Sequence, residues 1–155
     1  MKNSNIYDDL FAKIQAIFST SYQKNVMLQK ICDLLHQSIP GYDWVGFYMV
    51  DPNNKRKLIL GPYAGNSTEH AKIDFGQGIC GQAAESEETI IVDDVNSESN
   101  YLSCNINVRS EIVLPIFKNK EFIGEFDLDS HTPSRFGNED KEFLLKVIEL
   151  IIGVY

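Results

Sequence analysis

The sequence predicts one α+β domain, in which helices near both ends of the chain cover one face of a mostly antiparallel sheet. Three observations predict this class. Apolar residues recur at helical spacing within 7–39 and 143–152, β-branched and aromatic runs alternate with turn residues between them, and no repeat or linker divides the chain. With 155 residues, 43% of them hydrophobic, the chain can bury a sizeable core, so we expect residues 1–155 to form a single domain.

Two helices are expected first. The apolar stripe of the first helix has three- and four-residue spacing and consists of Tyr7, Leu10, Phe11, Ile14, Ile17 and Phe18. The stripe of the second consists of Val26, Met27, Ile31, Leu34, Leu35 and Ile39, and Pro40 ends the helix. Cys32 lies within the second stripe, which favours a packing role in the core.

The middle of the chain predicts about five strands. The run 44–50 leads into the turn residues 51–54, and 57–60 pairs back against it as a hairpin. Short strands at 71–74 and 89–92 flank a glycine turn that opens a short helix over 76–84.

A second hairpin and a last helix complete the expected domain. The hairpin joins 110–117 to 122–129 through Lys118-Asn119-Lys120. Asn138 is the expected N-cap of the helix, because the acidic Glu139 and Asp140 suit its positive end.

The composition restricts partners and compartment. A formal net charge of −8 argues against binding nucleic acid or an anionic membrane through a basic face. The apolar run 143–152 is too short for a membrane span and contains Lys146 and Glu149. Three cysteines are few for a secreted disulfide scaffold, and the N-terminal residues lack the pattern of a signal peptide. We therefore expect a cytoplasmic protein without membrane attachment.

Two cysteines are candidates for chemistry. Cys80 follows the glycine turn at the expected start of a helix, where free N–H groups and the helix dipole favour a thiolate. The alternative is a small buried hydrophobe in a tight turn. Cys104 lies in the polar segment 93–109, which is long for a connection inside a compact domain and therefore typical of a functional or disordered loop. Arg109 can supply positive charge near Cys104, and an incidental surface cysteine is the alternative.

Acidic residues form a further candidate cluster. Asp127 and Asp129 alternate along one strand and share a face, and Glu111 begins the neighbouring strand. Such a cluster in a cleft suits an ammonium ligand, or proton donation by an acid with a raised pKa, whereas a solvated strand face is the alternative.

Two aromatic residues share another strand face. Trp44 and Tyr48 lie four residues apart, and Gly46 between them leaves a gap that admits a small apolar group. Aromatic packing in the core is the alternative. His70, Cys80 and Cys104 have no metal-binding spacing, and no nucleotide motif is present, so we predict neither a metal nor a cofactor.

Taken together, these features resemble the free methionine-(R)-sulfoxide reductases, a family built on a GAF domain. The resemblance spans about 43–136, and the flanking helices fit the fold. The residues that carry it are Trp44-Val45-Gly46-Phe47-Tyr48, Leu60-Gly61-Pro62-Tyr63-Ala64-Gly65, Gly76-Gln77-Gly78-Ile79-Cys80-Gly81, Ser110-Glu111-Ile112-Val113-Leu114-Pro115 and Ile123-Gly124-Glu125-Phe126-Asp127-Leu128-Asp129-Ser130.

This resemblance implies an L-methionine (R)-S-oxide reductase. Cys104 would attack the sulfoxide, and Cys80 would then form a disulfide with it that a thioredoxin-type reductant reopens. His70 stands where many members carry a further cysteine, so the resolving role falls on Cys80 alone. GAF relatives often pair through their helices, which makes a homodimer one of the implied assemblies.

The resemblance also assigns the remaining candidates. The three acidic residues Glu111, Asp127 and Asp129 would hold the substrate's amino group and supply a proton, and Trp44 and Tyr48 would form a pocket for its methyl group. Two other functions remain open: a non-enzymatic GAF sensor for a small molecule, and an interaction protein switched by oxidation of Cys80 and Cys104. A cyclic-nucleotide sensor fits poorly, because an acidic pocket repels phosphate.

Overall fold

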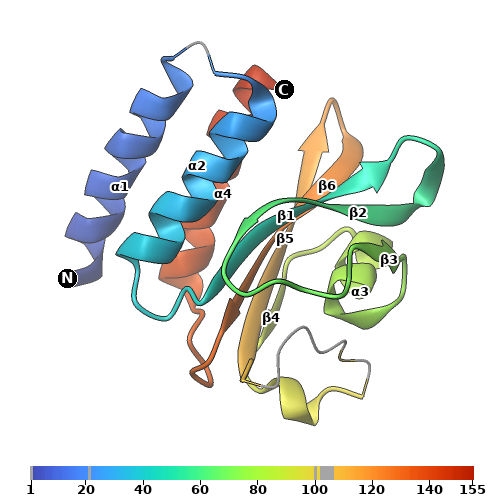
Figure 1. Ribbon diagram of the computed structural model, residues 1–155. Helices are drawn as coiled ribbons and strands as arrows, with labels where there is room; N and C mark the ends of the chain where they lie inside the picture. Colours follow the sequence, from blue (N-terminus) through green and yellow to red (C-terminus); the bar gives the residue numbers. More distant parts are fainter. Residues whose placement is uncertain (1, 21, 100, 102–106) are drawn as a thin grey trace.

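The computed structural model describes residues 2–20, 22–99, 101 and 107–155 (Figure 1). Its elements, in chain order, are α1 (Lys2–Phe18), α2 (Lys24–Ser38), β1 (Trp44–Asp51), β2 (Asn54–Ala64), β3 (Lys72–Asp74), α3 (Gly78–Ser86), β4 (Ile90–Val92), a 3₁₀ helix (Val95–Ser97), β5 (Ser110–Lys118), β6 (Glu121–Ser130) and α4 (Asn138–Val154). Over the described ranges, no helix is long and apolar enough to cross a bilayer.

The strands form one six-stranded sheet in the order β3-β2-β1-β6-β5-β4, and every described pairing is antiparallel. Helices α2 and α4 lie on one face, and α1 packs outside them against both. Figure 1 shows α3 on the opposite side of the sheet. The expected α+β class, with the N- and C-terminal helices on one face, is therefore confirmed.

The main hydrophobic core lies between the sheet and these three helices. Alternate residues of the long strands point into it, among them Val45, Phe47, Leu114, Phe126 and Leu128, all fully buried. The rings of Phe47 and Phe126, which are paired across β1 and β6, stack with centroids 4.4 Å apart. Because apolar residues take this face, the intervening residues of the same strands must face α3.

The predicted helical stripes reach this core. Leu10 and Ile14 of α1 and Ile31 and Leu35 of α2 are buried, whereas Val26 is 41% exposed. Cys32 is fully buried, and its thiol donates to the carbonyl oxygen of Pro62 at 3.6 Å. Its expected packing role is thereby confirmed.

Two local expectations were wrong. β2 extends to Ala64 rather than ending at Leu60, because a register shift opposite Gly46 and Tyr48 lets the strand continue past Gly61 and Pro62. Asn138 is the first residue of α4, and Gly137 is the N-cap. The cap is made from within the helix, since the Asp140 carboxylate accepts the Gly137 N–H at 2.9 Å.

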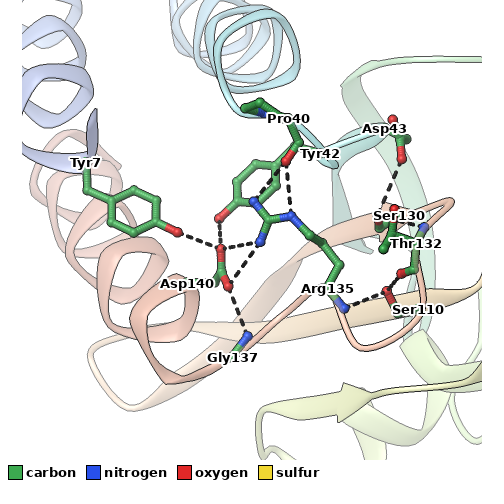
Figure 2. A network of polar contacts seen from close by, with 10 residues as sticks. All are labelled: Tyr7, Pro40, Tyr42, Asp43, Ser110, Ser130, Thr132, Arg135, Gly137 and Asp140. Carbon is green, nitrogen blue, oxygen red and sulfur yellow. Dashed lines mark hydrogen bonds and ion pairs between the residues drawn. The ribbon is translucent and has the colours of Figure 1, made fainter. Parts of the chain in front are cut away.

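Asp140 is also the centre of a buried polar network (Figure 2). The hydroxyl groups of Tyr7 and Tyr42 donate to its carboxylate at 2.8 and 2.7 Å, and Nη1 of Arg135 donates at 3.2 Å. Burial and the hydrogen bond to Asp140 raise the pKa of Tyr7 to about 12, so its hydroxyl stays a donor. The network thus joins α1, the residues after α2, and the start of α4.

Arg135 extends this network towards β5. Its Nε and Nη2 donate to the Pro40 carbonyl at 3.0 and 2.9 Å, and its backbone N–H donates to the Ser110 hydroxyl at 3.3 Å. The Ser110 hydroxyl donates in turn to the Thr132 carbonyl at 2.6 Å. These contacts fix the connection between β6 and α4, and with it the ends of β5 and β6 that carry acidic residues.

Replacement of Asp140 tests this network. Asp140→Ala leaves the partly buried Arg135 without its ion pair and two phenol groups without an acceptor. We expect the free energy of unfolding in urea to fall by about 3 kcal/mol. The control is Asp9→Ala, which removes an exposed ion pair with Lys13 and should change it by less than about 0.5 kcal/mol. Similar small effects of both substitutions would contradict the assignment.

Candidate active site

The strand register gathers acidic side chains on the face that meets α3. Glu125, Asp127 and Asp129 alternate along β6 and share one face. In β5, Glu111 pairs with Asp129. The sequence prediction that Glu111 joins the two aspartates on one surface is therefore confirmed.

All four carboxyl groups are buried. Glu125 is 0% exposed, Asp127 1%, Asp129 2% and Glu111 5%. A solvated strand face is thus excluded. Among the described residues, none of the four forms an ion pair with Lys, Arg or His. Buried carboxylates without compensating charge are costly, so protons or a bound cation must neutralise part of the cluster.

Glu111 is the group best placed to hold a proton. Burial raises its pKa well above the ordinary range, and the charges of Asp127 and Asp129 raise it further. Hydrogen bonds to the same two aspartates also favour its protonated form. Burial raises the pKa of Asp129 and Asp127 as well, and contact with Glu111 opposes that rise in each. The arrangement is a protonated glutamic acid beside two acceptor carboxylates.

α3 brings the thiol of Cys80 onto this cluster. The Sγ of Cys80, a carboxylate oxygen of Glu111 and one of Asp127 lie within 4.8 Å of one another. Burial raises the pKa of the thiol, and the nearby charge of Asp127 raises it further. The expectation that the helix N-terminus favours a thiolate is therefore contradicted, because desolvation and carboxylate charge outweigh the helix dipole. Cys80 rests as a neutral thiol.

An aromatic wall stands beside the carboxylates. Trp44, Gly46 and Tyr48 of β1 pair with Asp129, Asp127 and Glu125 of β6. Trp44 and Tyr48 are buried, with ring centroids 6.3 Å apart. The predicted gap above Gly46 is filled, since a Cβ there would clash with the Trp44 ring.

The same two rings hold the connection between β2 and β3. Nε1 of Trp44 donates to the Asn66 carbonyl at 3.1 Å, and the Tyr48 hydroxyl donates to the His70 carbonyl at 3.0 Å. The aromatic wall and this connection therefore form one unit. His70 contributes its backbone here and is half-buried two residues before β3.

Cys104 lies outside the described residues, so its distance to Cys80 stays a prediction. Both cysteines of the described ranges, Cys32 and Cys80, are free thiols. Arg109, which follows the Cys104 segment, is exposed, and its backbone N–H donates to the Ser130 carbonyl at 2.7 Å. This bond fixes the point at which that segment rejoins the sheet beside Glu111.

Sequence reasoning missed one residue of the cluster, Glu125. It lies two residues before Asp127, so the alternation that paired the two aspartates also includes it. The four acidic residues and Cys80 are referred to below as the acidic cluster: Cys80, Glu111, Glu125, Asp127 and Asp129.

A six-stranded antiparallel sheet, with helices on one face and α3 beside a buried polar site on the other, is the architecture of a GAF domain (Figure 1). The GAF domain model matches residues 25–152, which is most of the chain. The fold class and the family agree with the resemblance seen in the sequence.

Similar proteins and solved structures show to which family of GAF domains the chain belongs. A Saccharomyces cerevisiae protein named free methionine-R-sulfoxide reductase is 41% identical over 70% of this chain, which spans 61% of that protein. The reduced form of fRMsr from Staphylococcus aureus has a TM-score of 0.86 and 32% identity, over 95% of this chain and 93% of that one. Free methionine-R-sulfoxide reductase from Neisseria meningitidis, solved with its substrate, has a TM-score of 0.88 and 29% identity, over 95% and 86%. The chain belongs to the GAF-domain family of free methionine-R-sulfoxide reductases.

The acidic cluster predicts a distinctive pH dependence of stability. A carboxyl group whose pKa is higher in the folded than in the unfolded state stabilises the fold while it is protonated. That stability is lost as the pH rises from the unfolded to the folded pKa. Because burial raises the pKa of Glu125 well above its ordinary 4.5, the reduced protein should lose stability as the pH rises above about 5, by up to about 1.4 kcal/mol per pH unit for each such proton.

Glu125→Gln should make this decline shallower and should raise stability at about pH 8, because the amide has the same shape and no charge. Urea unfolding across the pH range measures the slope. Glu121→Gln, at the exposed start of β6, is the matched control and should leave the slope unchanged. Equal slopes for wild type and Glu125→Gln would contradict the prediction.

Proposed function

We propose that this protein reduces free L-methionine-(R)-sulfoxide to methionine by a thiol mechanism in which Cys104 is the nucleophile. The observation that carries the proposal is the acidic cluster, in which a buried thiol adjoins an acid that holds its proton. It belongs to a chain whose relatives include reductases of this substrate. A GAF sensor needs no thiol beside such an acid.

Binding of the substrate uses charge and shape. The carboxyl groups of Asp127 and Asp129 are buried and form no ion pair among the described residues. The ammonium group of the substrate binds beside them and balances part of their charge. Trp44 and Tyr48 supply the apolar wall on which the S-methyl group packs. The free amino acid is preferred, because a peptide-bound residue lacks the α-ammonium group.

Glu111 acts as the general acid. The Cys104 thiolate attacks the sulfoxide sulfur, the proton of Glu111 passes to the sulfoxide oxygen, and the S–O bond breaks as that oxygen moves to sulfur on Cys104. Methionine leaves, and Cys104 is a sulfenic acid. The raised pKa of Glu111 keeps its proton available at neutral pH, where an ordinary glutamate is ionised.

Cys80 completes the cycle. Its sulfur attacks the sulfenic sulfur of Cys104, a disulfide forms, and the hydroxyl group leaves as water after it takes the thiol proton. The Cys80 thiol contacts the carboxylates of Asp127 and Glu125, which can relay its proton to the leaving hydroxyl group. A thioredoxin-type dithiol then reduces the disulfide, so the sum is sulfoxide plus dithiol to methionine, disulfide and water. With His70 in place of a further cysteine, the resolving role falls on Cys80 alone.

Cysteine variants separate the two thiol roles. Cys104→Ser should release no methionine from free methionine-(R)-sulfoxide, since the nucleophile is gone. Pre-reduced Cys80→Ser should release about one methionine per chain without added reductant and then stop as a sulfenic acid. Chromatographic assay of methionine, with the S epimer as control substrate, measures both. Full steady-state turnover by Cys104→Ser would refute the nucleophile.

A folded, reduced wild-type protein that turns over neither epimer with dithiothreitol would favour the sensor function instead. Thiol titration after peroxide and after methionine-(R)-sulfoxide identifies a simple redox switch, which loses thiols only to peroxide.

The role of Glu111 is tested by its amide. Glu111→Gln keeps the shape of the protonated side chain and cannot give up a proton, so we expect kcat to fall by about 10² to 10⁴. Glu149→Gln on the exposed face of α4 is the control and should leave kcat unchanged. In the wild type, activity should fall as pH rises through the raised pKa of Glu111. A Glu111→Gln enzyme with wild-type kcat would rule out this acid.

A further inference from the structure

Three potential ligand atoms converge inside the acidic cluster from three different elements. They are the Sγ of Cys80 on α3, a carboxylate oxygen of Glu111 on β5 and one of Asp127 on β6, all within 4.8 Å of one another. We propose that these three side chains form a binding site for a thiophilic divalent cation, Zn²⁺.

The distances suit this ion after a small movement. Zn²⁺ binds sulfur at about 2.3 Å and oxygen at about 2.0–2.2 Å, so neighbouring ligands of a tetrahedral site lie roughly 3.3–3.7 Å apart. Binding of the ion would therefore draw the three ligand atoms closer together. Three protein ligands leave a fourth position open, as in zinc sites that bind water or a small molecule.

The surroundings of the three ligands call for positive charge. Asp127 is 1% exposed and Asp129 2%, and Oδ1 of each has no hydrogen-bond partner among the described residues; the fully buried carboxyl group of Glu125 has no partner there besides the Cys80 thiol. Glu125 lies one alternation along β6 from Asp127. Unpartnered oxygens at such burial are unfavourable, and a cation bound among them would offset that cost.

The donor set selects the kind of metal. Ca²⁺ and Mg²⁺ require six or more oxygen ligands and do not favour sulfur. One thiolate with two carboxylates at close range suits Zn²⁺ instead. The ligands stand at positions 80, 111 and 127, so no short metal motif announces them in the sequence.

Zinc at this position would regulate the site. Cys80 would be held as a metal ligand and could not resolve a sulfenic acid, and the carboxylates would be lost to the substrate's ammonium group. This consequence rests on the proposed function, whereas metal binding itself does not.

Cobalt provides a spectroscopic test that needs no turnover. The full, reduced chain is titrated with Co²⁺, which reports thiolate ligation by a charge-transfer band in the near ultraviolet. We expect this band to saturate at about one ion per chain and to disappear when Zn²⁺ displaces the cobalt. Failure to develop a band overturns the proposal and leaves the catalytic one untouched.

Variants then identify the ligands. Cys80→Ser should abolish the band, and Asp127→Asn should weaken Co²⁺ binding at least about tenfold, with circular dichroism to confirm that both are folded. Cys32→Ala is the matched thiol control, because Cys32 lies on the other face of the sheet, and it should retain the band. Cys104→Ser should also retain it. A band that survives Cys80→Ser, or one lost in Cys104→Ser, overturns the assignment.

Discussion

The burial of four carboxyl groups on one face of the sheet is the constraint on which the rest of the structure depends. On that face the carboxyl groups adjoin a second, smaller hydrophobic cluster, which includes Trp44, Tyr48 and Val113. The larger core lies on the opposite face, where α2 and α4 cover fully buried aliphatic and aromatic side chains. The helices at the two ends of the chain thus supply the larger core beneath the strands that carry the acidic cluster. The Asp140 network serves the same purpose at the rim, because it secures the ends of β5 and β6 beside Glu111.

Desolvation also explains how one site holds both an acid and a thiol without losing either to ionisation. In water Glu111 would carry charge and Cys80 would be partly reactive at all times. In the buried cluster the pKa of each is raised, so the proton needed for the sulfoxide oxygen is stored on Glu111 and Cys80 rests as a protonated thiol. The chemistry proposed for this protein therefore follows from low polarity around charged groups as much as from the groups themselves.

Much of this arrangement was predictable from the sequence. Helical and strand periodicities give the elements, and strand alternation alone places Asp127 and Asp129 together. Other features depend on tertiary context. The same alternation does not say whether such a face meets water or α3, and so it left the burial of Cys80 as one of two alternatives and did not predict the raised pKa of its thiol. The Trp44 ring over Gly46 and the cap of α4 by Asp140 depend on rotamers, which periodicity does not encode. The role of Cys104 is implied by the family, and this residue lies outside the described residues.

The two outermost strands have a consequence for the behaviour of the protein in a crowded solution. β3 and β4 have three residues each, whereas the strands between them have eight or more. Each outermost strand is too short to serve as a template for a passing chain, and the exposed Lys72 and Asp74 place charge on one border. Short, charged margins of this kind discourage edge-to-edge aggregation and the growth of fibrils. The molecule therefore borders the long central strands that carry its site with edges that are poor templates for its neighbours.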